Sequence, residues 1–170
     1  MDVSSTKALD LAGRIQGQVI CPGDDRYEEA RQAWNRAVDQ HPAAIVVAAS
    51  AADVAEAVRF ARQQGLGVAV QSTGHGVIRG ADGAVLVITS RLKELYVDVE
   101  ARSARLGAGL EWGEVLPVTQ KYGLAPLLGS SPNVGVVGYT LGGGLGWLGR
   151  KYGLATDSVL SFELVSAEGE

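Results

Sequence analysis

The chain has 170 residues, of which 46% are hydrophobic and 20% charged, so its length and composition allow a folded globular core and argue against disorder. The formal net charge of −4 argues against nucleic acid or an anionic membrane as the main partner, because phosphate contacts need clustered Lys and Arg. One cysteine and two histidines exclude a disulfide framework and predict no metal site.

The start of the chain carries no recognisable targeting signal. Residues 1–5 lack the basic region and apolar run of a signal peptide, and no apolar stretch is long enough to span a bilayer. The sequence therefore predicts a soluble, cytoplasmic protein.

The first quarter of the chain predicts an irregular lead-in followed by a helix. Residues 1–25 end in a turn-forming run of proline, glycine and two aspartates. Asp24 or Asp25 would cap a helix over about residues 26–39, and the following His41-Pro42 would end it.

Residues 44–70 predict a strand, a helix and a second strand. Residues 44–48 are a short apolar run, and Ser50 and Asp53 have the spacing of a capping box at the start of an amphipathic helix that Gly65 ends. Residues 68–70 predict the second strand, which makes a βαβ unit with a parallel pair. A third strand is expected at residues 85–88.

After Glu94 the pattern becomes antiparallel. Residues 96–99 and 104–106 alternate apolar and polar side chains and predict a hairpin. A helix over about residues 111–121 follows, although Pro117 within it requires a kink or a place in the first turn.

The last apolar-alternating run, residues 159–165, predicts a strand, and residues 167–169 predict a turn. A hairpin turn without a return strand leaves unpaired backbone groups, so we interpret the sequence as a fragment of a longer protein or as a chain that a second chain completes. The expected fold class is α+β, with a small parallel βαβ part followed by a mainly antiparallel sheet flanked by helices.

His75 is the strongest candidate for chemistry. It lies between Gly74 and Gly76 in a loop at the carboxyl end of a predicted strand, where ligands bind in open α/β sheets. The glycines let the backbone approach a ligand, and a neutral imidazole is a competent nucleophile near pH 7. A structural role is the alternative for any lone histidine, and we interpret His41, which precedes a proline, in that way.

Residues 129–146 are rich in glycine, which indicates close backbone approach or unusual dihedral angles. Gly144, Gly146 and Gly149 match the dinucleotide pattern G-x-G-x-x-G, but no unbroken strand before it and no long helix after it is predicted. A loop that presents backbone N–H groups to a phosphate is favoured. An NAD-binding domain, and glycines that serve packing alone, stay open as alternatives.

Four motifs in order carry a family resemblance: residues 68–76 (VAVQSTGHG), 131–146 (SPNVGVVGYTLGGGLG), 150–155 (RKYGLA) and 163–169 (ELVSAEG). Together they resemble the FAD-binding domain of the vanillyl-alcohol oxidase and p-cresol methylhydroxylase superfamily, in its berberine bridge enzyme-like branch. The resemblance covers nearly the whole chain from about residue 19.

The resemblance implies a two-subdomain fold with FAD between the subdomains, residues 1–92 forming the first and residues 93–170 an incomplete second. The family's separate substrate domain would be absent from this chain. His75 matches the histidine that bonds to the C8 methyl group of the flavin. The resemblance also implies cofactor contacts for the loop around His75, for the glycine-rich segment and for one position in the last motif: Gln71, Ser72, Thr73, Gly74, Gly76, Gly129, Ser130, Val134, Gly135, Gly138, Tyr139, Gly142, Gly143, Gly144 and Val165.

One position departs from part of the family. Doubly tethered members carry a cysteine just before the proline of the P-x-V-G motif, where this chain has Ser131. A hydroxyl is a much poorer nucleophile than a thiolate, so a single histidyl bond to FAD is expected. The family's catalytic base lies beyond residue 170, and no residue here can be named for that role.

The resemblance implies the FAD-binding part of an oxidoreductase that oxidises a small organic substrate, such as an alcohol, an amine or a sugar. A substrate domain or a second chain is the expected protein partner. The alternative is a non-catalytic flavin-binding module that acts as a structural partner.

Overall fold

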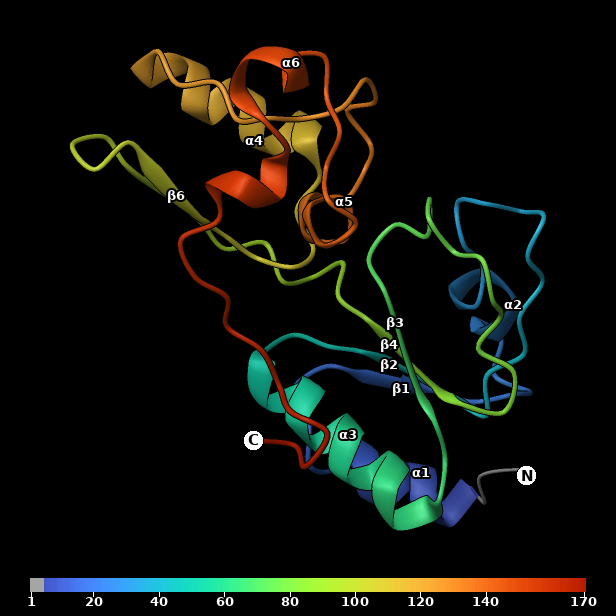
Figure 1. The fold of residues 1–170 in the computed structure, drawn as a ribbon. Helices are drawn as coiled ribbons and strands as arrows, with labels where there is room; N and C mark the ends of the chain where they lie inside the picture. The colour runs from blue at the N-terminus through green and yellow to red at the C-terminus, as the bar shows by residue number, and fades with distance from the viewer. Residues whose placement is uncertain (1–4) are drawn as a thin grey trace. The chain divides into compact units, whose positions relative to one another are not determined.

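The computed structural model describes residues 5–170, which divide into two compact units. The first unit contains the chain up to Arg91 together with Leu164–Glu170, and the second is Leu92–Glu163. Figure 1 labels most of the helices and strands of both units. The mixed α and β content, with one sheet that contains parallel strands and one antiparallel pair, is the predicted fold class.

The first unit is built on a four-stranded sheet with the order β1-β2-β4-β3, its strands being β1 (Gln18–Ile20), β2 (Ala44–Val47), β3 (Val68–Gln71) and β4 (Val85–Ile88). β4 is parallel to both β2 and β3, whereas β1 is antiparallel to β2. The expected pairing of β2 with β3 is therefore wrong, because β4 lies between them. All four residues of β4 are buried, as a central strand requires, while Val68 and Val70 of β3 are exposed at the edge.

Two helices cover one face of this sheet, α1 (Ser5–Ala12) and α3 (Ala51–Gln64) (Figure 1). α3 follows the prediction closely. The Ser50 side chain accepts the N–H of Asp53 at its start, and Gly65 ends it in a left-handed conformation with φ of 67°. α1 and β1 lie in the stretch predicted to be irregular, where elements of eight and three residues are too short to leave a clear periodicity.

The helix predicted over residues 26–39 is mostly absent. Only α2 (Tyr27–Ala30) forms, and its N-cap residue, Arg26, makes no side-chain cap. Asp24 instead accepts the backbone N–H of Cys21 with its carboxylate, so it stabilises the turn before the helix.

The chain leaves the helix at Arg31 because tertiary contacts replace helical ones. The Arg31 guanidinium bonds to Glu28, to Asp39 and to the carbonyl of Gln40, which folds residues 31–40 back on themselves. The backbone N–H groups of Trp34 and Asn35 then bond to the loop after β3 rather than to a preceding helical turn.

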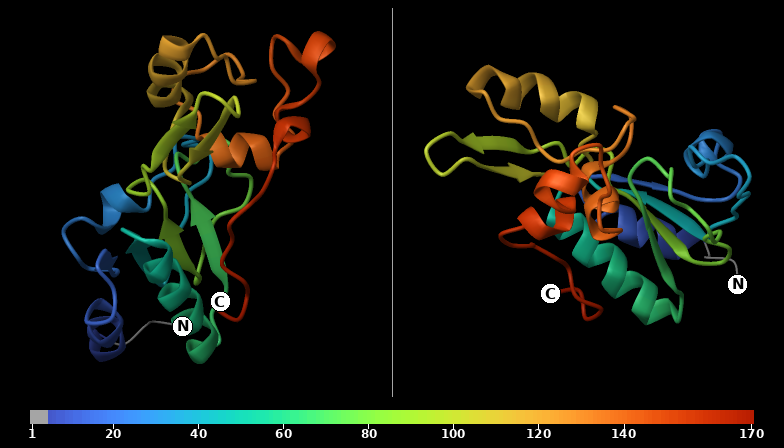
Figure 2. Two further views of the ribbon diagram at one scale, coloured as in Figure 1. Left: turned by 90° about the vertical axis from the view of Figure 1, so that its left-hand side faces the viewer. Right: turned by 45° about the horizontal axis from the view of Figure 1, so that its top comes forward.

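The second unit combines the predicted hairpin, β5 (Leu95–Asp98) and β6 (Ser103–Leu106), with three α-helices and two short 3-10 helices. The hairpin and the helices are drawn in Figure 2. Its core holds Leu110, Trp112, Val115 and Val136, with Leu95 and Leu106 of the hairpin packed against them. The helical elements are α4 (Trp112–Thr119), η1 (Gln120–Tyr122), α5 (Val136–Leu141), α6 (Gly149–Tyr152) and η2 (Ala155–Ser158).

Two details of the second unit differ from expectation. Pro117 lies inside α4, beyond its first turn, and the helix changes to a 3-10 turn three residues later. Residues 136–141, which read as a broken apolar run, form α5; the Thr140 hydroxyl bonds back to the carbonyl of Val136 within that helix.

The strand predicted at residues 159–165 is absent. The backbone there is irregular, with Leu160 85%, Phe162 58% and Leu164 72% exposed. An alternating pattern gives a strand only where another strand offers hydrogen bonds, and no described strand pairs with it. The turn after it forms as expected, with Gly169 at φ of 81°. Among the described residues, no helix has both the length and the apolar character needed to cross a membrane.

Candidate cofactor-binding site

The loop that leaves β3 presents a run of backbone N–H groups that the protein itself does not use. Among the described residues, no protein group accepts a hydrogen bond from the amides of the loop, which are those of Ser72, Thr73, Gly74, His75 and Gly76. Gly74 bends this loop with a left-handed φ of 81°. Consecutive free amides in a bent loop make a concavity for an anion such as a phosphate.

Two side chains of the same loop also lack partners. The Ser72 hydroxyl oxygen and the Nε2 atom of His75 are covered from solvent, and neither has a hydrogen-bond partner among the described residues. A buried polar atom without a partner costs about 1–3 kcal/mol. A loop that binds a polar cofactor is expected to have such unpartnered atoms when the cofactor is absent. The Ser72 hydroxyl and the His75 imidazole, beside the free amides, fit that expectation.

The imidazole of His75 is stacked on the indole of Trp34, with ring centroids 3.9 Å apart and the planes inclined by 17°. The backbone of Trp34 and Asn35 is hydrogen-bonded to the same loop. The N–H of Trp34 donates to the carbonyl of Thr73 (3.0 Å), and the N–H of Asn35 donates to that of Gly74 (3.2 Å). The sequence did not indicate Trp34, because this residue falls in the part of the predicted helix, after α2, that the structure shows as irregular.

The side chain of Gln71, one of the predicted cofactor-binding residues, is buried and hydrogen-bonded within the protein. Its side-chain oxygen accepts from Gln40 (3.0 Å), and its nitrogen donates to the carbonyl of Gln32 (3.1 Å). Gln40 in turn donates to the carbonyl of Arg31 (2.7 Å). Both amides are thus used within the protein, and they tie residues 31–40 to the start of the loop.

In the second unit the glycine-rich segment surrounds Tyr139, which α5 carries. A Cβ on Gly129, Gly144 or Gly146 would come within 3.1 Å of an atom of the Tyr139 ring or its hydroxyl. Trp112 meets the same ring edge-on, with centroids 5.7 Å apart. These glycines therefore have a packing reason, in addition to any contact with a ligand.

The Tyr139 hydroxyl is buried without a hydrogen-bond partner among the described residues. Burial raises the pKa of this phenol, so it stays protonated and able to donate at neutral pH. It is a polar atom in a glycine-lined setting that a bound group could satisfy.

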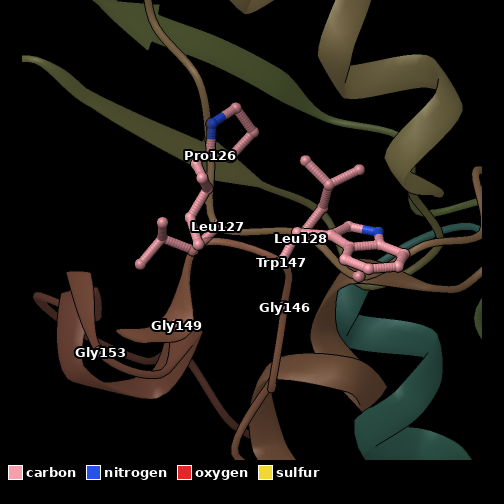
Figure 3. A pocket seen from close by; sticks show the side chains of 9 residues that line it. Pro126, Leu127, Leu128, Gly146, Trp147, Gly149 and Gly153 are labelled. Atoms are coloured by element: carbon pink, nitrogen blue, oxygen red, sulfur yellow. The ribbon is translucent and has the colours of Figure 1, made fainter. Parts of the chain in front are cut away.

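An apolar pocket of about 280 Å³ lies in the second unit, and the sequence did not predict it (Figure 3). Trp147 and Gly146 line it from one segment and Leu128 and Gly129 from another, with the remaining lining residues Pro126, Leu127, Leu148, Gly149 and Gly153. Figure 3 shows the apolar side chains of Pro126, Leu127, Leu128 and Trp147 at this pocket. Pockets with mainly apolar walls are the usual places for small organic groups.

The predicted cofactor residues fall into two sets. Residues 71–76 and Val165 belong to the first unit, and the other predicted positions belong to the second. In the second set, Ser130 and Gly138 are exposed, and a Cβ on Gly138 would meet nothing within 4 Å. In the first set, Gly76 is also exposed, and a Cβ on it would likewise meet nothing within 4 Å.

The pattern of Gly144, Gly146 and Gly149 lacks the setting of a dinucleotide fingerprint. The element directly before it is the helix α5 and not a strand, and the helix after it, α6, has only four residues. Within residues 5–170 no three His, Cys, Asp or Glu side chains form a group that could hold a metal ion.

Residues 42–170 match the family of FAD binding domains. The chain belongs to this family. It lies in the vanillyl-alcohol oxidase and p-cresol methylhydroxylase superfamily and in its berberine bridge enzyme-like branch, as its motifs indicate.

Among relatives of this FAD-binding domain, (R)-6-hydroxynicotine oxidase of Paenarthrobacter nicotinovorans is 37% identical over an alignment of 170 residues, which covers 99% of this chain and 37% of that protein. An FAD-linked oxidoreductase of Bacillus subtilis is 32% identical over 92% of the chain and 36% of its own length. The chain therefore spans little more than a third of the curated relatives that it matches.

Solved structures agree with the fold of this FAD-binding domain. The crystal structure of 6-hydroxy-D-nicotine oxidase from Arthrobacter nicotinovorans matches 99% of the chain and 36% of that chain, with a TM-score of 0.88 and 34% identity. The berberine bridge enzyme-like protein 1 of Physcomitrella patens matches 98% of the chain and 37% of its own, with a TM-score of 0.88 and 33% identity. The chain thus shares the fold of the FAD-binding part of these proteins.

Proposed function

We propose that this domain holds FAD through one covalent bond from His75 and serves an oxidase or dehydrogenase that acts on a small alcohol, amine or sugar. The observation that carries the proposal is the imidazole of His75, which has no hydrogen-bond partner among the described residues and lies in a loop of five free amides. The amides suit the pyrophosphate, and the imidazole suits a nucleophile.

The other predicted residues would each contact a different portion of the cofactor. The glycine-rich segment and Tyr139 would line the phosphate and ribityl portion, where the unpartnered hydroxyl of Tyr139 can donate. The backbone of Val165 would contact adenine. When bound, the flavin accepts a hydride from a C–H bond of the substrate and passes the electrons on, often to dioxygen. A substrate domain, in the same protein or in a second chain of a cytoplasmic complex, would cover the flavin ring.

The proposed bond joins a nitrogen of His75 to the carbon of the flavin C8 methyl group. One C–H bond of the methyl group and one N–H bond of the imidazole are broken, and both hydrogens leave as protons. The two electrons would pass through the flavin ring to dioxygen, which would take up two protons and be reduced to hydrogen peroxide. The product would be an oxidised flavin attached to His75.

A single bond is proposed because Ser131 occupies the position at which doubly tethered relatives carry a cysteine. The serine hydroxyl stays protonated at neutral pH and is a poor nucleophile toward the flavin ring. Attachment through His75 withdraws electron density from the ring, which should raise its reduction potential, and it prevents loss of the cofactor.

The test is a visible absorption spectrum of the full-length protein before and after acid precipitation. We expect yellow protein whose flavin stays with the pellet, with a mass increase equal to FAD. His75→Ala should release all of its flavin, and His41→Ala, which removes the exposed histidine of the connector, should behave like wild type. Free FAD released from acid-treated wild type would overturn the tether.

A non-catalytic flavin-binding module is the second candidate. Among the described residues the site offers amide donors, a hydroxyl and an imidazole, and no carboxylate is hydrogen-bonded to His75. These groups hold a cofactor but include no assigned base for a substrate. If the protein is yellow but its flavin is not reduced by alcohols, amines or sugars, the non-catalytic module is favoured. If one of these substrates bleaches the flavin, the enzyme is favoured.

A further inference from the structure

The side chain of Trp34 is placed in a way that burial does not explain. It is 59% exposed, although tryptophan contributes to a core mainly through its large apolar surface. Its aromatic contact is the stack on the imidazole of His75. A tryptophan that stays largely in water while facing one histidine is better explained by what it does to that histidine.

The position of Trp34 is fixed through the backbone on both sides of the loop. Besides the two bonds from Trp34 and Asn35 to the loop carbonyls, the Asn35 side chain donates to the carbonyl of Val77 (3.1 Å). Residues 34 and 35 therefore run alongside residues 73–77 over the whole turn that contains His75. The indole is held relative to the imidazole without help from its own burial.

The imidazole, in contrast, has few other constraints. Its neighbours in the chain are Gly74 and Gly76, which have no side chains to hold it, and neither ring nitrogen makes a hydrogen bond among the described residues. Nucleophilic histidines are commonly oriented by a hydrogen bond to a carboxylate or a carbonyl. Here that role is open, and a flat surface against the ring is the remaining means of orienting it.

We infer that Trp34 is a positioning residue that sets the plane of the His75 imidazole for attachment to the flavin, an inference that rests on the proposed histidyl bond. The lone pair of an imidazole nitrogen lies in the ring plane, so the nitrogen attacks the C8 methyl carbon only when that plane is correctly turned. Rotation about the Cβ–Cγ bond of His75 would drive the ring edge into the indole. The stack thereby holds the ring in one of its orientations.

The test measures how fast FAD becomes covalently bound. Flavin-free full-length protein, prepared from riboflavin-starved cells, is mixed with FAD under dioxygen, and samples are quenched in acid over time. We expect Trp34→Ala to bind FAD but to form the covalent bond about tenfold more slowly than wild type. Trp34→Phe keeps an aromatic face and should recover the rate to within about threefold of wild type.

Two further variants separate orientation from folding. Trp34→Leu keeps apolar bulk without a flat ring, so its rate of covalent attachment should be as low as that of Trp34→Ala. If the alanine variant fails to fold, the rates of Trp34→Phe and Trp34→Leu are compared instead. Tyr96→Ala removes a similarly exposed aromatic side chain from β5 and should match wild type. Equal rates in the Phe and Leu variants, or a wild-type rate in Trp34→Ala, would overturn the inference.

The failure of this inference and that of the proposed tether give different results. If acid releases all flavin from wild type, the histidyl bond is refuted and the role of Trp34 falls with it. If wild type and the Trp34 variants all retain flavin at one rate, the tether stands and only the positioning role is refuted.

Discussion

Ala33 lies directly against Gly74, so that a Cβ placed on the glycine would be 2.6 Å from the Cβ of Ala33 and 2.9 Å from its Cα. Gly74 also has a φ of 81°, which disfavours any residue with a side chain. The contact brings residues 33–35 against the His75 loop, and it makes this glycine a structural requirement independent of any ligand.

Gly74→Ala should therefore lower the free energy of unfolding by about 2–3 kcal/mol or more, because steric overlap adds to backbone strain. Thermal unfolding of the flavin-free protein measures this. Gly76→Ala is the matched control, since a Cβ there meets nothing within 4 Å, and its melting temperature should stay near that of wild type. A weaker affinity of Gly76→Ala for FAD would then report close approach of the cofactor. Equal melting of the Gly74 variant and wild type would contradict the described packing.

The paired amides of Gln40 and Gln71 should couple energetically. Gln71→Leu removes the buried acceptor of the Gln40 amide and the donor to the part-buried carbonyl of Gln32, and it should cost about 1–3 kcal/mol. The double variant with Gln40→Leu should cost less than the sum of the single variants, by about 1 kcal/mol. Urea unfolding of the four proteins measures the coupling, and strict additivity would refute the Gln40–Gln71 hydrogen bond.

The buried carboxylate of Asp53 should make the stability of the first unit depend on pH. Burial alone would raise the pKa of Asp53, but hydrogen bonds from the backbone amides of Gln16, Ala49 and Gly17, with a further one involving Ser50, lower it below its ordinary value of 3.8. Because the folded pKa is depressed, the stabilisation is complete above the unfolded pKa and is lost as pH falls through the folded pKa.

Asp53→Asn should thus lower the free energy of unfolding at about pH 7 by roughly 3 kcal/mol, since an amide accepts fewer hydrogen bonds than a carboxylate. The gap between wild type and variant should narrow once the pH is below 3.8. Asp10→Asn, at an exposed ion pair with Arg14, is the control and should cost less than about 0.5 kcal/mol. A gap that stays constant with pH would show that the Asp53 carboxylate is not the source.

Removal of the Tyr139 hydroxyl should have opposite consequences with and without cofactor. In flavin-free protein, Tyr139→Phe should leave stability unchanged or slightly increased, because the buried hydroxyl has no partner among the described residues. If the hydroxyl donates to bound FAD, the same change should weaken FAD binding about fivefold. Noncovalent binding in a His75→Ala background isolates this effect. Tyr122→Phe, at a half-exposed phenol, should change neither quantity.

Local signals predicted the elements that depend on local chemistry. Ser50 caps α3 and Gly65 ends it as expected, because both roles are set by a few neighbouring backbone groups. The hairpin of β5 and β6 was likewise visible in its alternation. His75 and its loop were found because flanking glycines and the end of a strand are features of the sequence itself.

What the sequence could not show depends on partners distant along the chain. Residues 31–40 have helical composition, but Arg31 bonds to Asp39 and to the carbonyl of Gln40, and the backbone amides of Trp34 and Asn35 bond to the His75 loop instead of to a helical turn. The central position of β4 in the sheet could not be predicted either. β2 and β4 are both short, buried apolar runs, and periodicity alone does not tell which of them lies in the middle. Trp34 was missed for the same reason, since its role exists only through the stack on His75.

The stretch of residues 160–164 has a consequence for handling the protein. Its apolar side chains Leu160, Phe162 and Leu164 are exposed along a backbone that pairs with no described strand. Such a segment favours edge-to-edge association of molecules at high concentration, as in the first steps of aggregation. Glu163, which pairs with Arg105, is the one charged residue within it, and a charge of this kind opposes such association.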